Sequence, residues 1–309
     1  MKLNYFNYQV TERSELIYSF DMNDFFSAFV DVNNPTWKNQ FSVSGENIYL
    51  FRLPSYRNYM FLKTAQNEFI HKIDKNNLGH NEIAEELRRD ESLGFASYIY
   101  IGDKFLGIGS TFSAPRHTAF AKFVNDIFQK ISLHDYQFSL KPLERIASRS
   151  EVMKMQHVGR MNLSVDTSNS FAQSIAGLFR ADAHELDAIE GVEVIIKPKR
   201  QTDIKNIANK VFDVVGDVGV EKLVVRAKQE LTDKLADIYV EGRGVLYDFI
   251  ESRDHGYIPI EITDKVIHNE SLPDKLHEVL SNETIREESI EQISAFGDVG
   301  AWDRFMDDL

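Results

Sequence analysis

The sequence contains no cysteine, which excludes a disulfide framework, a thiolate metal site and a cysteine nucleophile. It also lacks any uncharged apolar stretch of about 18 residues, the length that a membrane-spanning helix requires. Near the amino terminus, Glu12, Arg13 and Glu15 interrupt the chain before a signal peptide or membrane anchor could form. These absences predict a soluble, cytoplasmic protein.

The catalytic signatures that residue spacing can reveal are missing as well. The chain has no phosphate-binding Gly-x-x-x-x-Gly-Lys-Ser/Thr loop, no His-Glu-x-x-His motif, no Gly-x-Ser-x-Gly nucleophile and no calcium loop. Gly107 and Gly109 do not begin a dinucleotide-binding fingerprint, because Phe112 stands where its third glycine would be. We therefore expect neither an enzyme nor a bound cofactor.

Charge is distributed unevenly along the 309 residues, whose formal total is −13. Residues 1–140 carry −2, residues 141–228 carry +2 and residues 229–309 carry −13. A near-neutral body with local clusters of Lys and Arg can bind an anion even when the whole chain is acidic. The acidic carboxy-terminal part is expected to be a solvated surface, which could also compete for those clusters.

The chain is too long for one hydrophobic core, since single cores stop growing near roughly 250 to 300 residues. Short clustered strands precede Lys141-Pro142, and a regular alternation of strands and helices follows. We predict an α+β fold with two domains and mixed sheets. The predicted parts are an N-terminal α+β domain at 1–141, a basic β-α-β-α-β domain at 142–228 and an acidic, mostly helical carboxy-terminal segment at 229–309.

The hydrophobic pattern of the middle domain predicts three strands with a helix after each of the first two. The predicted strands are 152–165, 192–197 and 220–226. The helices are expected to begin at Ser168 or Ser170 and at Thr202, since Ser and Thr are good caps. Such an alternation indicates a small mixed or parallel sheet with helices over one or both faces.

A first basic cluster lies where the second of these strands ends. Its members are Lys197, Lys199 and Arg200 around Pro198, with Lys205 and Lys210 on the next helix. Cations this close repel one another, so a waiting anion is one reason to keep them together. The free N–H groups of a helix that begins at Thr202 would point toward the same anion.

A second basic cluster is spread over the first and third strands and the segment before them. Its members are Lys141, Arg145, Arg149, Lys154, Arg160, Lys222, Arg226 and Lys228. Lys and Arg at strand ends also keep sheet edges soluble, which is an equally good explanation. Aromatic side chains are nearly absent from both clusters, which favours contact with the phosphates of a duplex over stacking on a single strand. No sequence-reading module is visible, so any DNA binding should lack sequence preference.

Several short blocks resemble, in the same order, the RexA family of exclusion proteins from lambda-type prophages. The blocks are Asp90–Phe95 with the strand Ser97–Ile101, Gly107–Pro115, Val152–Arg160, Val194–Arg200 with Asp203–Lys205, and the weaker Val225–Lys228. They cover residues 90–228, and the similarity is thin before them and hardly detectable after them. The long acidic carboxy terminus departs from the family.

The resemblance implies a cytoplasmic, prophage-encoded protein of an abortive-infection system, acting in antiviral defence with a membrane partner of the RexB type. It also implies a homodimer that binds double-stranded DNA without sequence preference, with a fold similar to that of the recombination-associated RdgC proteins. The DNA-binding candidates in the matching blocks are Lys154, Arg160, Lys197, Lys199, Lys205, Arg226 and Lys228. Arg145, Arg149 and Arg200 are candidates on the argument from charge alone.

Three functions remain open at this point. The first is a dimeric, non-enzymatic DNA-binding protein of a phage exclusion system. The second is a protein-interaction sensor that signals to a membrane effector through its acidic carboxy-terminal helices. The third is a nuclease that would hold a divalent ion with Asp182, Glu185 or Asp187, although a solvated acidic loop explains this cluster, which includes His184, better.

Overall fold

The chain forms two compact units, which we describe from a computed structural model. The structure describes residues 1–64, 71–73, 80–82, 87, 92–111, 113–179, 185, 188–200, 202–216, 218–228, 235–241, 244–281 and 284–309. The first unit joins Met1–Leu143 to Leu246–Leu309, and the second is Glu144–Val245. Both units combine helices with sheets, so the predicted α+β class is confirmed.

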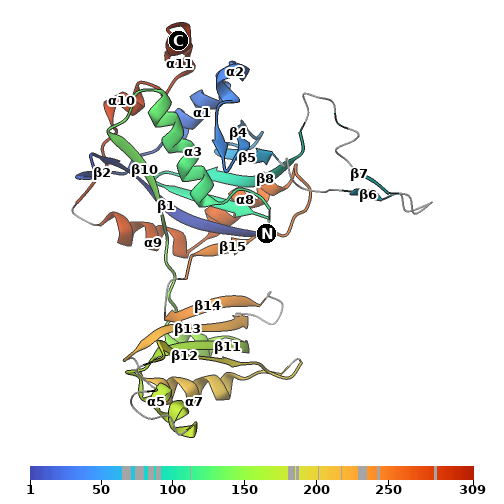
Figure 1. The fold of residues 1–309 in the computed structure, drawn as a ribbon, viewed down its shortest axis with the longest axis vertical. Coiled ribbons are helices and arrows are strands. Elements are labelled where there is room, and N and C mark those ends of the chain that lie inside the picture. Colours follow the sequence, from blue (N-terminus) through green and yellow to red (C-terminus); the bar gives the residue numbers. More distant parts are fainter. Residues whose placement is uncertain are drawn as a thin grey trace. The chain divides into compact units, whose positions relative to one another are not determined.

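The first unit is built around β1 (Lys2–Glu12), a long strand that pairs along both edges (Figure 1). The main sheet runs in the order β16-β2-β1-β9-β8-β5-β4-β3, and β10 and β15 also pair with β1. The other strands of this sheet are β2 (Leu16–Tyr18), β3 (Ser42–Val43), β4 (Glu46–Arg52), β5 (Asn58–Thr64), β8 (Gly94–Ile101), β9 (Phe105–Ser110), β10 (Tyr136–Pro142), β15 (Tyr247–Phe249) and β16 (Ile285–Arg286). The sheet is mixed, as predicted, because β16 runs parallel to β2 while the other pairs are antiparallel. A separate pair, β6 (His71–Ile73) and β7 (His80–Glu82), is also antiparallel.

Helices pack on the main sheet of the first unit. They are α1 (Asn23–Asp31), α2 (Pro35–Lys38), α3 (His117–Lys130), α8 (Ile258–His268), α9 (Ser271–Leu280), α10 (Glu291–Ser294) and α11 (Val299–Asp307). Alternation along β1 sends Phe6, Tyr8 and Val10 into a core shared with α1, α3 and α11, and sends Leu3 and Tyr5 into a second core shared with α8 and α9. This strand is therefore buried on both faces.

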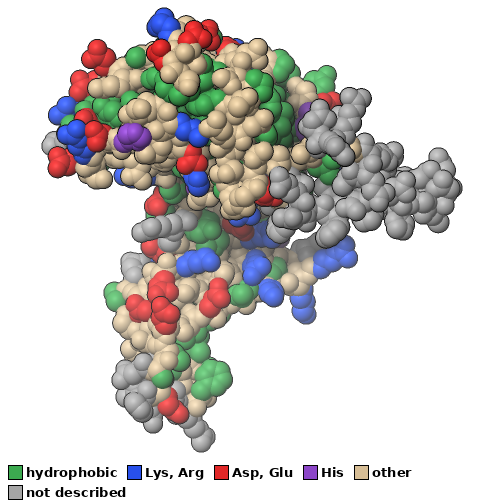
Figure 2. All heavy atoms as spheres, turned by 45° about the horizontal axis from the view of Figure 1, so that its top comes forward, with side chains coloured by type: hydrophobic (Ala, Val, Ile, Leu, Met, Phe, Trp, Pro, Cys, Tyr) green, Lys and Arg blue, Asp and Glu red, His purple; other side chains and the backbone are tan. Residues whose placement is uncertain are grey.

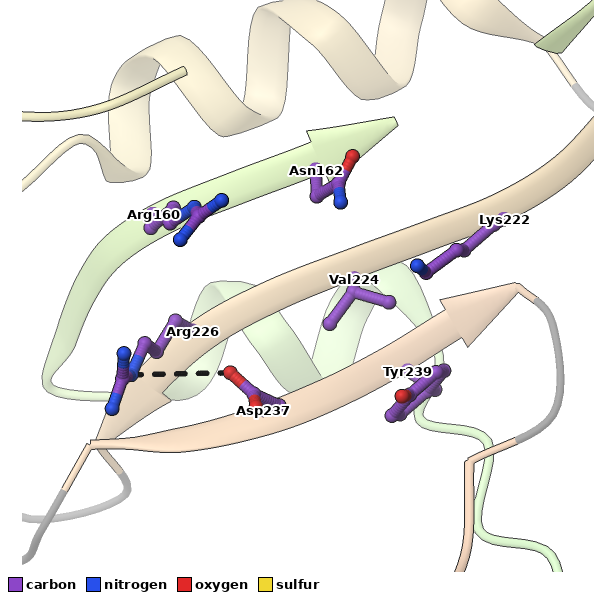
Figure 3. Close-up of a pocket in the computed structure, with 7 residues that line it drawn as sticks. All are labelled: Arg160, Asn162, Lys222, Val224, Arg226, Asp237 and Tyr239. Atoms are coloured by element: carbon purple, nitrogen blue, oxygen red, sulfur yellow. Dashed lines mark ion pairs between the residues drawn. The ribbon is translucent and has the colours of Figure 1, made fainter. Parts of the chain in front are cut away.

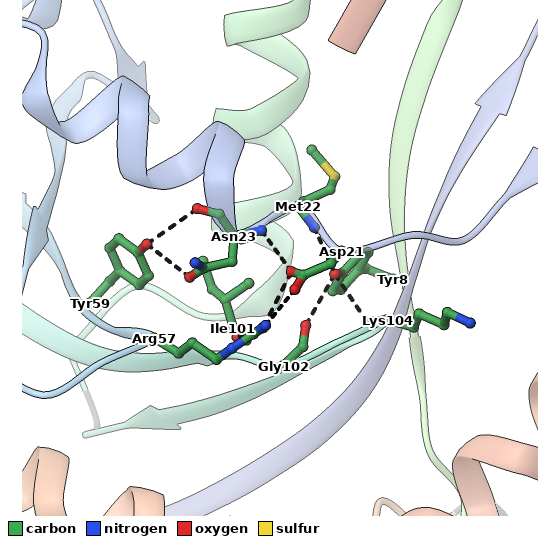
Figure 4. Close-up of polar contacts among 9 residues, drawn as sticks. All are labelled: Tyr8, Asp21, Met22, Asn23, Arg57, Tyr59, Ile101, Gly102 and Lys104. Atoms are coloured by element: carbon green, nitrogen blue, oxygen red, sulfur yellow. Dashed lines mark hydrogen bonds and ion pairs between the residues drawn. The ribbon is translucent and has the colours of Figure 1, made fainter. Parts of the chain in front are cut away.

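A buried hydroxyl ties the end of β8 to the start of α1 (Figure 4). The Tyr8 hydroxyl accepts hydrogen bonds from the backbone N–H groups of Met22 (3.0 Å) and Lys104 (3.1 Å) and donates to the carbonyl of Gly102 (3.1 Å). Burial raises the pKa of Tyr8, so the hydroxyl keeps the proton that it donates. Next to it, Arg57 pairs with Asp21 and donates to the carbonyl of Ile101 (2.9 Å). These contacts satisfy loop backbone groups that would otherwise be buried unpaired.

The expected carboxy-terminal segment at 229–309 is divided between the two units. Residues 246–309 complete the first unit, whereas β14 (Ala236–Glu241) belongs to the second. Trp302 of α11 is fully buried, with its ring centroid 5.6 Å from that of Phe29 and 4.8 Å from that of Phe296. Acidic residues of this segment such as Asp264 and Asp274 are exposed, while the apolar sides of the amphipathic helices α8, α9 and α11 cover the sheet.

The second unit is a four-stranded sheet in the order β12-β11-β13-β14 with helices on one face (Figure 1). Its other elements are α4 (Arg149–Lys154), β11 (His157–Asp166), α5 (Ser170–Leu178), β12 (Gly191–Ile196), α7 (Lys205–Val215) and β13 (Val220–Lys228). The expected order of strands and helices is present, followed by a fourth strand. All its strand pairs are antiparallel, so the interpretation as a mixed or parallel sheet was wrong for this unit.

Two predicted boundaries in this unit were also wrong. The strand expected from residue 152 begins only at His157, because the preceding residues form α4. Ser148 and Glu151 make a capping box there, in which each side chain bonds the backbone N–H of the other residue. The helix expected from Thr202 begins at Lys205.

In the described part of the chain, no helix combines the length and apolar character needed to cross a bilayer.

Replacing Trp302 with Ala is expected to destabilise the first unit by about 3–5 kcal/mol, because truncation of a large buried aromatic leaves a cavity among rigid rings. Chemical denaturation followed by circular dichroism measures the change. Leu309→Ala serves as the control, since Leu309 is exposed. Equal stability of the two variants would show that α11 does not belong to the core.

Candidate nucleic-acid interface

The sheet of the second unit has a covered face and an open face. On β11, Met161, Leu163 and Val165 are buried against the helices, so the residues between them lie on the other face. The same alternation on β13 buries Leu223, Val225 and Ala227. We call the opposite side the open face; its side chains include Arg160, Asn162 and Ser164 of β11, Lys222, Val224, Arg226 and Lys228 of β13, and Asp237 and Tyr239 of β14.

The strand register places two arginines directly opposite each other on the open face. Arg160 pairs with Arg226, and toward the same end of the strands His157 pairs with Lys228. Like charges directly opposite on neighbouring strands destabilise a sheet. An anion bound between them would relieve this repulsion. Figure 2 shows Lys and Arg side chains gathered on one side of the second unit.

A hollow of about 190 Å³ lies in the open face and includes the two opposed arginines (Figure 3). Its lining residues are Arg160, Asn162, Lys222, Val224, Arg226, Asp237 and Tyr239. Six of them form two rows across three strands, since the register aligns Arg160 with Arg226 and Asp237, and Asn162 with Val224 and Tyr239; Lys222, which pairs with Ser164, lies beyond the second row. One row is therefore charged, and the other offers an amide, an aliphatic group and an aromatic ring.

Three carboxylates, those of Asp237, Glu193 and Glu221, bond side chains of this sheet. Asp237 pairs with Arg226 at 3.9 Å, with both side chains about half exposed, so the ion pair is weak. Away from the arginines, Glu193 accepts a hydrogen bond from Asn162 Nδ2 (2.9 Å), and Glu221 accepts one from Ser164 Oγ (3.1 Å). These two carboxylates lie toward the Ser164 end of the strands, where Lys222 also lies, and the arginines lie toward the other end.

The first basic cluster follows β12 directly. Lys197, Lys199 and Arg200 are exposed, and Lys197 leaves the strand beside Arg160, because the preceding Ile196 pairs with Met161. These three side chains are available to an anion.

A carboxylate lies beside the start of α7, the helix that follows this cluster. Asp203 Oδ1 accepts hydrogen bonds from the backbone N–H groups of Lys205 (2.8 Å) and Val158 (3.1 Å). The carboxylate thus takes one of the α7 N–H groups that were expected to point toward a phosphate. Lys205, at the start of α7, is half-buried.

The remaining candidates do not all lie on the open face. Arg149 donates to the carbonyls of Phe212 (3.0 Å) and Gly216 (2.6 Å), at the carboxy-terminal end of α7. A cation at this position satisfies orphan carbonyls and complements the helix dipole, so Arg149 stabilises the fold. Lys154 is exposed at the end of α4, and Arg145 is exposed in the segment that runs beside β14.

The possible metal cluster lies mostly outside the described residues, which include Glu185 but not Asp182, His184 or Asp187. Across the described ranges, no three His, Asp or Glu side chains gather in a way that could hold a metal ion.

Sequence reasoning missed Asn162, Asp237 and Tyr239. Asn162 could have been found by counting alternate residues from Arg160. Asp237 and Tyr239 were assigned to a helical stretch, although the alternation of Ile238 and Val240 with polar residues is a strand signal.

Comparison with known proteins identifies relatives. The model of a protein family described as "RexA: Intracellular sensor of Lambda phage, Abi component" matches residues 1–235. The proteins named rexA from Escherichia phage lambda and from Enterobacteria phage 434 are each 25% identical to this chain over 206 residues, which is 66% of this chain and 72% of each relative. The family match includes β11, β12 and β13 and ends just before β14.

Replacing Arg149 with Met is expected to destabilise the second unit by about 1.5–3 kcal/mol, because two carbonyls lose hydrogen bonds from a charged donor. Thermal unfolding measures the loss. Arg145→Met removes the same charge from an exposed position and should leave stability within about 0.5 kcal/mol of the original. A larger effect at Arg145 than at Arg149 would contradict this assignment.

Proposed function

The chain belongs to the RexA family of phage exclusion components, and we propose that it binds double-stranded DNA without sequence preference through the open face of its second unit. The cations proposed to contact phosphates are Arg160, Arg226, Lys222 and Lys228 of the open face, with Lys197, Lys199 and Arg200 beside it. Lys154, Lys205 and Arg145 are proposed as peripheral contacts. Arg149 is left out because it holds the end of α7.

The opposition of Arg160 and Arg226 is the observation that carries this proposal. The register fixes the Cα atoms of these two residues opposite each other, so their guanidinium groups can separate only by turning the side chains. Each can form a planar, bidentate contact with a phosphate, which makes arginine well suited to this role.

The charge of the two units agrees with a local binding surface. The first unit has 20 basic and 32 acidic residues, and the second has 15 and 16. The second unit is therefore close to neutral, and most of the acidic imbalance lies in the first. DNA binding by such a chain depends on a few converging cations and must weaken steeply with salt.

Contact through phosphates fits the layout of the second unit. Its helices α5 and α7 pack on the covered face, so neither lies on the open face as a recognition helix would (Figure 1). Phosphate contacts position a protein on DNA but carry no sequence information.

The homodimer, the membrane partner similar to RexB, the cytoplasmic location and the fold similar to RdgC stay predictions from the resemblance. The absence of enzyme activity also stays a prediction.

The alternative function is a sensor that docks a basic partner on the acidic helices. Its support is the charge of the first unit, to which α8, α9 and α11 contribute acidic residues. Deleting residues 273–309 cannot test it, because the deletion removes Trp302 from the core. Replacing exposed acidic residues such as Asp264 and Asp274 with Asn leaves the core intact, and loss of partner capture would favour this alternative.

Replacing Arg160 and Arg226 together with Gln is expected to lower the salt dependence of DNA binding. The slope of log K against log salt should fall by about 0.9 for each phosphate that the variant no longer neutralises, so by roughly 2 for the double variant. Fluorescence anisotropy with one duplex at several salt concentrations measures the slope.

The matched control for this experiment is Lys210→Gln. Lys210 is exposed on α7, whose apolar side packs on the covered face, so its replacement should leave the slope unchanged. If the double variant and the control behave alike, the open face is not the binding surface. Absence of binding at low salt would remove the proposal altogether.

Replacing Asp237 with Asn is expected to strengthen duplex binding about two- to fivefold. The substitution removes a carboxylate that competes with phosphate for Arg226, and an exposed ion pair of this kind contributes only about 0–1 kcal/mol. Titrations at low salt measure the gain, which should shrink as salt screens the charges. Weaker binding by Asp237→Asn would mean that the ion pair is needed to position Arg226.

A further inference from the structure

We infer that the hollow of the open face accepts an unpaired nucleobase against Tyr239, so that this surface prefers DNA with single-stranded segments to fully paired duplex. The inference rests on the proposed function, because the neighbouring arginines would hold the phosphates of the same strand. It concerns the second row of the hollow, Asn162, Val224 and Tyr239, which contains no cation to neutralise a phosphate.

Tyr239 is held as a fixed platform. Its backbone pairs with Val224 on one side, and on the other its carbonyl accepts a hydrogen bond from the N–H of Ala147 (2.7 Å). Gly244 lies against the ring, since a Cβ atom at that position would come within 2.5 Å of Tyr239 Cδ2. The ring cannot move toward Gly244, and it lines the hollow (Figure 3).

Asn162 supplies an acceptor that a phosphate cannot use. Its Nδ2 donates to Glu193 at 2.9 Å, which fixes the orientation of the amide, since the opposite orientation would set two oxygens against each other. Oδ1 is then buried, and no donor among the described residues bonds it. Such an orphan acceptor is costly, so a small movement of the surrounding side chains that lets a donor reach it is favourable. Phosphodiesters have no donor, whereas nucleobases carry N–H groups.

The two rows match the parts of a nucleotide. Successive residues on one face of a strand are about 7 Å apart, and neighbouring strands are about 4.8 Å apart. The charged row therefore lies one sugar's length from the row of Asn162, Val224 and Tyr239. A strand can place a phosphate on Arg160 and Arg226 and its base over Val224, beside the ring of Tyr239.

An unpaired base is required, because bases inside a duplex have both faces covered by their neighbours. Aromatic side chains on open sheets stack on bases that are splayed out of a strand. The sequence had disfavoured stacking because the basic clusters contain almost no aromatic residues. The register brings Tyr239 beside them from a strand that lies outside those clusters.

The test uses the full chain and two DNA probes of equal length, a complete duplex and the same duplex with a short gap that exposes one 2-aminopurine. The gapped probe is expected to bind more tightly, and stacking should quench the 2-aminopurine fluorescence. Tyr239→Ala should weaken binding of the gapped probe by roughly 5- to 150-fold, the range for loss of one stacked base, and leave the duplex nearly unchanged. Tyr239→Phe should keep both the preference and the quench.

Tyr257→Ala is the control, since Tyr257 is an exposed tyrosine of the first unit. If Tyr239→Ala does not fold, the inference is tested with the unaltered protein, by the quenching of 2-aminopurine fluorescence and by the ratio of its affinities for the gapped probe and the duplex. If the protein binds both probes equally, without quenching and with a salt slope that depends on Arg160 and Arg226, the inference fails and the proposed function stands. If neither probe binds at low salt, the proposed function fails, and the inference fails with it.

Discussion

The open face depends on a bulge in β11 at Gly159. Alternation alone would put Arg160 on the same side as Val158, which is buried under the helices. The register shifts between these two residues, so Val158 pairs with Ala227 and Arg160 pairs with Arg226. The extra residue reverses the parity of the strand and sends Arg160 outward with Asn162. Without it, a guanidinium would enter the core, and the pair of arginines would not exist.

The two units differ in the size of their cores and in how much of their sheets the helices cover. The first unit is rich in buried aromatic rings, and the apolar sides of its helices close both faces of the sheet. The helices described in the second unit pack on one face of its sheet, and its core is smaller. A sheet with one uncovered face presents fixed side chains at regular spacing, which suits a repeating ligand such as the backbone of a nucleic acid.

Arginines serve different purposes in this chain, and the groups that each arginine contacts show whether it stabilises the fold or is available to a ligand. Arg149 and Arg226 both belong to the basic region that the sequence indicated. Arg149 donates to two carbonyls at the end of a helix, whereas Arg226 faces another arginine and pairs with Asp237 at 3.9 Å. Net charge does not distinguish these cases, because it counts every arginine equally, whether or not its guanidinium group is hydrogen-bonded within the protein.

The sequence alone determined the α+β class, the order of strands and helices in the middle of the chain, the family, and the presence of a basic region. Each of these follows from local composition or from short blocks of sequence in a fixed order. It did not reveal that residues 246–309 complete the first unit, or that Tyr239 and Asp237 stand beside the arginines. Those facts depend on pairing between residues far apart in the chain and on the parity set by one bulge. Hydrophobic periodicity shows that a residue is on a face, but only the register shows which residues share that face with it.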